Sequence, residues 1–564
     1  MPVLLVKANS QPRWLFPFVT AVAFTFCAVP LLRLLQAGLV SIFKGDAARI
    51  VLDPGVWTAA FNSLSTSFLG MIVSVLIGGF FALALTLADV RGKWLLSFLF
   101  MLPTMIPPQV TALSWVGMSG PSSPLLKALG LGPPLGSPQP LYSTAGIALL
   151  FGVQHAPLVY LTLRAGLLAL PRDGIEAARL SGASSMRVLK DIILPLSLPG
   201  LIAGAAIAFV SGIGNFGIPA ILGIPASIYT LPTLIYSRLA SFGSGTFGEI
   251  AILSGMIAVI AVGGISIQER ALRGRDYRVI GLSGSAATFR LGFFRPFVES
   301  ALWLLLFIML IAPFLALLAA SLVPAYGVAL SFKSASFAAY EEILFRQTVT
   351  RTAFSNSLFL ATTTSLGLLV IGVLTAYTLT RGANRFTALL SGMIEIPYAL
   401  PGIVISVAFV LVFAAPMPVL GVTIYGTIWI ILAAYFSSFL AVGLKPVISA
   451  FRQLDPALEE SARLSGAGFY RRLTDIIVPL IAPAAGASVI LVFLISCNEL
   501  TVSALLWSVG TQTLGVAIYN LDDSGSYDLA AALSVLVVVM VATLMLLLEF
   551  LAVRMPKGVV PWRN

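Results

Sequence analysis

The sequence has little charge, and this shortage excludes a soluble globular protein. Only 10% of its 564 residues are Asp, Glu, Lys or Arg, whereas a soluble domain carries about 25%. Hydrophobic residues make up 59% of the chain, and the mean hydropathy is +1.01. Nearly continuous apolar stretches of about 20 residues favour membrane-spanning helices over a β-barrel. We therefore predict an all-α, polytopic membrane protein.

Cysteine, histidine and nucleotide-binding motifs are also scarce. Cys27 and Cys497 lie in separate apolar segments, so neither a disulfide framework nor a metal cluster is expected. With one histidine, no H-E-x-x-H and no G-x-S-x-G, the chain lacks the patterns of an intramembrane enzyme. The only Gly-Lys pair, Gly92-Lys93, is followed by Trp94, so no phosphate loop is present. We expect no catalytic residue, no metal site, no cofactor and no ATP hydrolysis in this chain.

Twelve apolar stretches are long enough to cross a membrane as helices. We place them at about 14–36, 58–88, 94–118, 142–168, 196–222, 246–268, 297–322, 355–380, 386–415, 422–445, 481–506 and 527–553. The net charge of +11 then indicates membrane topology and not nucleic-acid binding, because cytoplasmic loops of membrane proteins are rich in Lys and Arg. With both termini in the cytoplasm, 25 of the 33 Lys and Arg residues fall on the cytoplasmic side. This asymmetry favours a multi-pass protein with both termini cytoplasmic.

The chain is a tandem duplication. Asn62-Ser63-Leu64 recurs as Asn356-Ser357-Leu358, and the prolines at 103 and 107 recur at 397 and 401, always 294 residues later. The predicted units are a first transmembrane domain (1–268), a cytoplasmic linker (269–296) and a second transmembrane domain (297–564). Because each half has an even number of spans, six, the two repeats run parallel in the membrane.

Two polar segments interrupt the apolar chain, at residues 176–195 and 460–479. Their first eight residues, EAARLSGA and ESARLSGA, match at seven positions, and a glycine precedes a proline by 13 residues in both. Glu-Ala-Ala-Arg-Leu favours a helix, and Gly182 or Gly466 then ends it or permits a tight turn that side chains would block. We predict a short helix–turn–helix at the cytoplasmic surface. It either packs on the protein's own helices or is recognised by another protein, and the close repetition favours recognition.

These two segments resemble the signature cytoplasmic loop of ATP-binding-cassette importer permeases. The first copy has the full pattern: Glu176, Ala177, Ala178, Gly182, Ile192, Leu194 and Pro195. The second copy has Glu460, Ser461, Ala462, Gly466 and Pro479, and it departs from the pattern at Ser461 and Val478. Both departures are conservative.

The resemblance implies partners and a location. In that family each loop forms a coupling helix that docks in a groove of an ATPase subunit. It therefore implies two copies of an ATPase that bind the ATP, an extracytoplasmic substrate-binding protein, and the bacterial inner membrane. Residues 214–223 (GNFGIPAILG) and 228–231 (IYTL) resemble ferric-iron permeases in particular. Ferric iron is thus the expected cargo, and thiamine, phosphonate and polyamine permeases, which have related segments, are the alternatives.

A secondary transporter of the major facilitator type is the alternative from another class. It too has two parallel six-helix halves with cytoplasmic termini, and residues 87–93 (LADVRGK) resemble its signature loop. That segment does not recur in the second half, and this alternative leaves the duplicated loops unexplained. The requirement of transport for ATP or for an ion gradient distinguishes the two classes.

Three polar residues in apolar spans are candidates for the translocation path. Glu499 and its repeat partner Asn215 line the route or its gate, or else they make helix–helix hydrogen bonds or lie at an interfacial position. Glu395 lies beside Pro397, where it faces the route or packs between helices. The repeated prolines predict bent helices, either at the core of the pore or in ordinary packing.

Overall fold

The computed structural model describes residues 12–134, 136–170, 172–240, 246–273, 289–325, 327–382, 385–416 and 421–552. Regular structure in these residues is helical, apart from one isolated bridge between Ala88 and Phe289. Ten helices are long and apolar enough to span a membrane, and two further pairs of helices are sharply bent. Counted as one span per bent pair, they make twelve, and the predicted all-α polytopic fold is confirmed.

The spans of the two halves correspond one to one. Those of the first half are α1–η1–α2 (Leu15–Phe43), α4 (Pro54–Leu87), the bent pair α5 (Lys93–Met105) and α6 (Pro108–Ser119), α8 (Thr144–Leu168), α10–η2–α11 (Ser185–Gly214) and α14 (Thr246–Leu272). Those of the second half are η4–α15–η5–α16 (Gly292–Ser321), α18 (Thr348–Arg381), the bent pair α19 (Arg385–Ala399) and α20 (Gly402–Phe413), α21 (Ile428–Gln453), α23–η7–α24 (Phe469–Cys497) and α27 (Tyr527–Ala552).

Short helices connect these spans. They are α3 (Asp46–Leu52), α7 (Pro124–Ala128), α9 (Arg172–Leu180), α12 (Gly217–Leu222), α13 (Leu231–Ala240), α17 (Ala338–Glu341), α22 (Pro456–Leu464), α25 (Ser503–Leu506) and α26 (Leu514–Asp523).

The fifth and eleventh spans differ from the sequence prediction at both ends. Each begins inside the polar loop, at Ser185 and Phe469, and each ends early, at Gly214 and Cys497, where the predicted ends were 222 and 506. The helices run on through Pro195 and Pro479 because a π-helical turn lies directly before each proline. Proline has no backbone N–H to donate, and its ring clashes with the carbonyl group of the preceding turn. The wider π-helical turn relieves both effects.

The first span of each half packs against the broken helices of the other half. α2 lies against α20, and α1 lies against α18 and α19; in the reciprocal position, α16 lies against α6. Side chains of α1 and η1 (Leu15, Val19, Ala23 and Cys27) share one hydrophobic core with Leu360 and other residues of the second half. The two halves are therefore interlocked in space.

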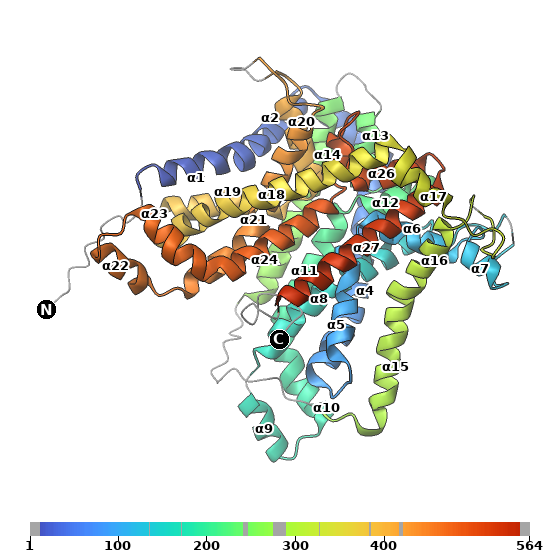
Figure 1. Ribbon diagram of the computed structural model, residues 1–564, viewed down its shortest axis with the longest axis horizontal. Coiled ribbons are helices and arrows are strands. Elements are labelled where there is room, and N and C mark those ends of the chain that lie inside the picture. The colour runs from blue at the N-terminus through green and yellow to red at the C-terminus, as the bar shows by residue number, and fades with distance from the viewer. Residues whose placement is uncertain are drawn as a thin grey trace.

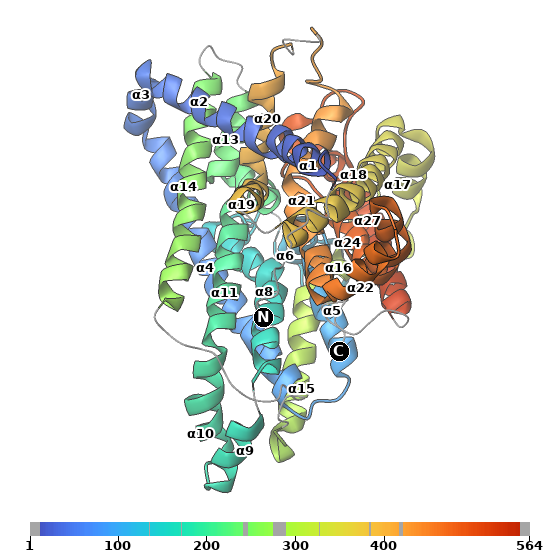
Figure 2. The same ribbon diagram turned by 90° about the vertical axis from the view of Figure 1, so that its left-hand side faces the viewer.

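The two bundles meet at one end and diverge toward the other. In Figure 1, α9 and α10 form the lower tip of the first bundle, and α22 and α23 lie at the left tip of the second. Helices α7 and α17 lie on the opposite side of the molecule. Figure 2, turned by 90°, again separates α9 from α22. The two polar loops thus stand at the free tips of diverging bundles.

Close contact between α4 and α8 holds the first bundle together. A Cβ atom at Gly78 would lie 2.3 Å from the carbonyl oxygen of Ala156, and one at Gly152 would lie 2.2 Å from Val73 Cγ1. At the adjacent Gly79 nothing lies within 4 Å. Small residues of this kind let membrane helices approach each other closely, where dispersion contacts and not the hydrophobic effect stabilise the pair.

The end of the linker is tied to the first half, although residues 274–288 of the predicted linker lie outside the described residues. The backbone of Phe289 exchanges hydrogen bonds with Leu87 and Asp89, at 2.7 and 3.2 Å. The Asp89 carboxylate accepts a hydrogen bond from the Leu291 amide at 2.9 Å, and this bond lowers the pKa of Asp89. The segment that resembles a major facilitator loop therefore anchors the linker.

Candidate functional site

The first polar loop is a helix, a glycine turn and a second helix, as predicted. α9 ends in a Schellman motif: the amide of Ala183 donates to the carbonyl of Ala178, and that of Gly182 to Arg179, both at 3.0 Å. This motif needs a left-handed residue, and Gly182 has φ of +83°. Nothing lies within 4 Å of a Cβ placed there, so backbone conformation and not crowding requires the glycine. The expectation that a side chain would disfavour this turn is confirmed, and the reason is the backbone conformation.

The second loop repeats this geometry at α22. The amide of Ala467 donates to Ala462 and that of Gly466 to Arg463, again both at 3.0 Å. Gly466 also has φ of +83° and open space around it. Two segments 284 residues apart therefore adopt the same turn, despite Ser461 standing in place of alanine.

Each loop exposes a large apolar pair that the sequence prediction missed. Leu180 is the last residue of α9 and Leu464 is the last residue of α22, and each is 89% exposed. Met186 and its repeat partner Tyr470 are exposed beside them. Glu176 and Glu460 are exposed on the same helices. The leucines lay within the matched EAARL and ESARL segments, so their signal was present in the sequence. Paired exposed apolar side chains at equivalent tips are typical of an interaction surface.

The two proline breaks lie where the bundles meet. α5 and α6 bend by 104°, and α19 and α20 bend by 110°, so the predicted kinks are confirmed. Helices of the two halves touch here: a Cβ at Gly214 would lie 2.8 Å from Pro401 Cβ, and Asn498 donates to the carbonyl of Met105 at 2.9 Å. The breaks are thus part of the contact between halves.

Asn215 and Glu499 occupy equivalent places beside these breaks. Asn215 Oδ1 accepts a hydrogen bond from the Ile218 amide at 3.1 Å, which caps α12. Glu499 Oε1 accepts from the Val502 amide at 2.7 Å, which caps α25. Glu499 lies just after the membrane-spanning helix α24 and not inside it, because α24 ends at Cys497. Glu395 is exposed on α19, apart from both caps. A role of the three residues in the path stays a prediction.

Gln109 is a polar residue at the same centre that the sequence prediction missed. It is fully buried at the start of α6, with Gly217 and Gly515 against it. Among the described residues, none lies in hydrogen-bonding position to Oε1 or Nε2. An amide beside Pro107-Pro108 in an apolar stretch was the available signal, because polar groups inside a membrane are costly.

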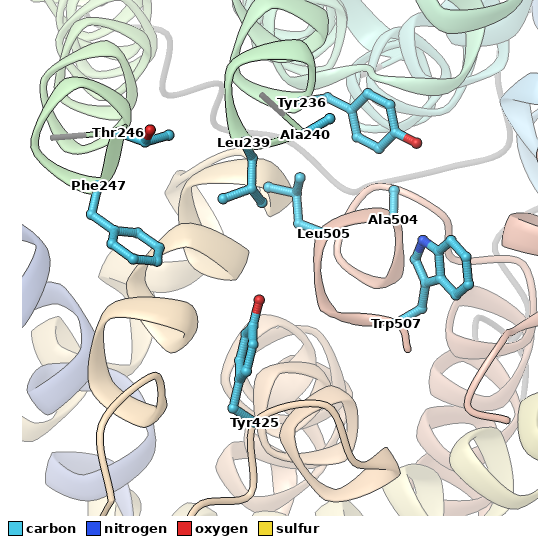
Figure 3. Close-up of a pocket in the computed structure, with 9 residues that line it drawn as sticks. All are labelled: Tyr236, Leu239, Ala240, Thr246, Phe247, Tyr425, Ala504, Leu505 and Trp507. Carbon is cyan, nitrogen blue, oxygen red and sulfur yellow. The ribbon is translucent and has the colours of Figure 1, made fainter. Parts of the chain in front are cut away.

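A cavity of about 390 Å³ opens between the halves on the side away from the loops. Figure 3 shows it lined by Tyr236 and Leu239 of α13, Tyr425 of the segment before α21, and Trp507 after α25. Tyr236 also meets Tyr519 of the other half, with ring centroids 5.9 Å apart. The side chains are aromatic and aliphatic, so this mouth is apolar with a few hydroxyl groups.

Two acidic residues end α26 beside this mouth. Burial, and then the neighbouring charge of Asp523, raise the pKa of Asp522 to about 6. Elsewhere in the described residues, no group of three or more His, Cys, Asp or Glu is placed to hold a metal ion.

Comparison with known proteins gives the same two-part organisation. The sequence model of the family described as binding-protein-dependent transport system inner membrane component matches residues 74–274 and 368–560. The two matches begin 294 residues apart, the offset of the internal repeat.

Three relatives illustrate the range of similarity. The probable ABC transporter permease protein y4fN of Sinorhizobium fredii (strain NBRC 101917 / NGR234) is 26% identical, over 97% of each chain. The ferric transport system permease protein FbpB of Actinobacillus pleuropneumoniae is 25% identical, over 86% of this chain and 70% of that protein. The molybdenum transport system permease protein ModB of Escherichia coli (strain K12) is 33% identical, over 38% of this chain and 93% of that protein.

Proposed function

The chain belongs to the family of binding-protein-dependent transport system inner membrane components, and from this premise we propose that it imports ferric iron with two copies of a separate ATPase. It is a permease subunit of an ABC importer and not an enzyme. Membership in this family argues against the alternative of a secondary transporter of the major facilitator type. The family implies an ATPase and a substrate-binding protein as partners.

The observation that supports this function best is the pair of identical glycine turns at the tips of the two bundles. Each presents an exposed leucine, Leu180 or Leu464, and an exposed glutamate beside it. Each ATPase would bind one loop in a groove. The groove would receive the exposed leucine and complement the charge of the glutamate, so both loops would be bound in the same way. One ATPase per loop gives the two copies, and the chain itself holds no ATP.

The diverging bundles supply the movement. We infer that both loops and both termini face the cytoplasm, in line with the excess of Lys and Arg in those segments. When the two ATPases close on ATP, the tips at α9 and α22 are drawn together. The contact at the proline breaks then acts as the fulcrum, and the mouth beside Tyr236 opens to receive cargo. No covalent step takes place in the permease.

Ferric iron as cargo has narrower support. The relative named for ferric transport spans both halves of this chain, whereas the molybdenum relative spans 38% of it. The y4fN relative spans nearly the whole chain, and its name gives no cargo. The segment 214–223 contains α12 and its cap Asn215, so the resemblance to ferric-iron permeases falls at the centre of the molecule.

The ATPase assignment is tested by co-purification of the permease with its ATPase and by ATP-driven uptake in vesicles. Leu180→Glu and Leu464→Glu are expected to lower the amount of bound ATPase roughly tenfold, because a charge replaces an anchor that the groove desolvates. Phe332→Glu is the matched control, since Phe332 is fully exposed away from the loops. Retention of the ATPase by both leucine variants would show that the loops do not dock it.

The cargo is tested separately, with the binding protein supplied and labelled ferric iron, molybdate, thiamine, a phosphonate or a polyamine offered. Uptake of ferric iron that stops when ATP is withheld is expected. Uptake of another cargo with no response to iron would refute the ferric assignment and leave the importer in place. Uptake driven by an ion gradient without ATP would refute the importer itself.

A further inference from the structure

One buried carboxylate fastens the second loop to the membrane helices. Glu459, directly before Glu460, is only 7% exposed, whereas its neighbour is exposed. It accepts a hydrogen bond from the hydroxyl of Tyr377. Its two oxygens also lie 3.3 Å from Arg381 Nε and 3.9 Å from Arg472 Nε. One side chain therefore holds three partners in a largely buried place.

These partners come from separate elements. Glu459 is on α22, Arg472 is on η7 after the glycine turn, and Tyr377 and Arg381 are one turn apart on α18. Residues at i and i+4 lie on one face of a helix, so both point at the loop. α18 in turn packs along α21 and α24 and reaches α26. α18 therefore connects the region of α22 with the region of α26.

The first half has no such cluster at the equivalent positions. Ile175 stands where Glu459 does, Val188 where Arg472 does, and Leu87 where Arg381 does. All three are buried in the apolar core of the first half, and Leu83 stands at the place of Tyr377. Apolar contact has no preferred direction, whereas the hydrogen bond from Tyr377 to the Glu459 carboxylate fixes distance and angle. The two loops are therefore held by contacts of different kinds.

We propose that Glu459 is a positioning residue that locks the second coupling loop to α18, so that the two loops transmit ATPase movement through unlike joints. The second joint is directional and charged, and the first is apolar. This proposal rests on the proposed importer function, and it assigns to Glu459 a role distinct from docking, since its side chain is turned inward.

The first test is Glu459→Gln in the full complex of permease, ATPase and binding protein. Glutamine keeps the size and one acceptor for Tyr377 but removes the charge that faces two arginines. We expect the ATPase to co-purify normally and ATP hydrolysis to stay within about twofold, while uptake falls roughly tenfold. The number of ATP molecules spent per cargo then rises about tenfold, which is the mark of uncoupling.

A second variant copies the first half into the second: Tyr377→Leu, Arg381→Leu, Glu459→Ile and Arg472→Val together. It removes the carboxylate together with both arginines that face it, so folding and ATPase binding are expected to be normal. Uptake should stay at least about fivefold below wild type, because an apolar joint replaces the directional one. Ile175→Val, a small change at the equivalent place of the first loop, is the control and should keep uptake within twofold.

Either of two results would overturn the proposal. Uptake by Glu459→Gln within twofold of wild type would show that the charge is dispensable. Full uptake by the fourfold variant would show that the cluster merely satisfies its own buried charges. Failure of the proposed function looks different, because wild-type permease would then not retain the ATPase at all.

Discussion

The glycine of the second loop allows backbone conformation to be tested apart from size. Gly466 has φ of +83°, and no atom lies within 4 Å of a Cβ placed on it. Alanine there meets no neighbour but must adopt a left-handed conformation, which costs about 1–2 kcal/mol. That cost lowers the population of the native turn about 5- to 30-fold relative to a competing turn. Uptake by Gly466→Ala should fall within that range, while the amount of folded permease stays unchanged.

Two companion variants separate conformation from other effects. Asparagine tolerates the left-handed region better than alanine, so Gly466→Asn should lose less than about threefold in uptake. Gly468, two residues on, also has open space but an ordinary φ of −67°. Gly468→Ala should therefore leave uptake within about twofold. The assay is ATP-driven uptake in vesicles, normalised to permease and to bound ATPase.

The reasoning would be refuted if the stability of the isolated permease depended on the size of the side chain at position 466. If leucine or tryptophan at 466 destabilised the isolated permease more than alanine does, the space around the turn would not be open. If these larger residues lowered only ATPase binding, the extra loss would report the ATPase surface. Equal effects of Gly466→Ala and Gly468→Ala would show that the Schellman turn is not what transport requires.

Two further predictions concern stability in detergent. Gly78→Ala should lower the free energy of unfolding by about 2–3 kcal/mol, because its Cβ would lie 2.3 Å from a backbone carbonyl, whereas Gly79→Ala should be neutral or slightly stabilising; equal melting temperatures of the two variants would contradict the close contact of α4 and α8. Asp522→Asn should raise the melting temperature at pH 7.5 but not at pH 4, because a pKa raised to about 6 in the folded protein makes ionisation of Asp522 destabilising as pH rises. A gain for Asp522→Asn that persisted at pH 4 would contradict this cause.

Repetition made most of the fold predictable. Residues that recur at a fixed offset identified the two halves, and the doubled prolines located both bends. The glycine and proline of each loop predicted a helix, a turn and a second helix. These features depend on local backbone chemistry, which a sequence shows directly.

The contacts between helices were not predictable in the same way. A helix such as 15–43 is apolar nearly all round, so its sequence has no stripe that says which neighbour it faces. Its packing against α18, α19 and α20 therefore appears only in the structure. Glu459 is a similar case, because the exposed Glu460 beside it matches the loop pattern while Glu459 does not. Its burial depends on Arg381, 78 residues earlier in the chain.

The hydrogen-bond partners of the two caps at the centre could not be predicted from the sequence. Asn215 and Glu499 were expected to face the path or a neighbouring helix. In the structure their side chains accept hydrogen bonds from amides of the short helices that follow. Their role in the path stays a prediction. The ends of the spans at Gly214 and Cys497 were not predictable, because apolar residues continue beyond both breaks.

The interlocking of the halves has a consequence for synthesis. The helix at 15–43 emerges first, but its partner α18 begins only at Thr348. At about 5–20 residues per second, roughly 15–60 s pass before that partner is made. During this interval the membrane must hold an apolar helix without its native neighbour, and the first half cannot complete its packing. Assembly of the protein is thus a post-insertion event, timed by the second half.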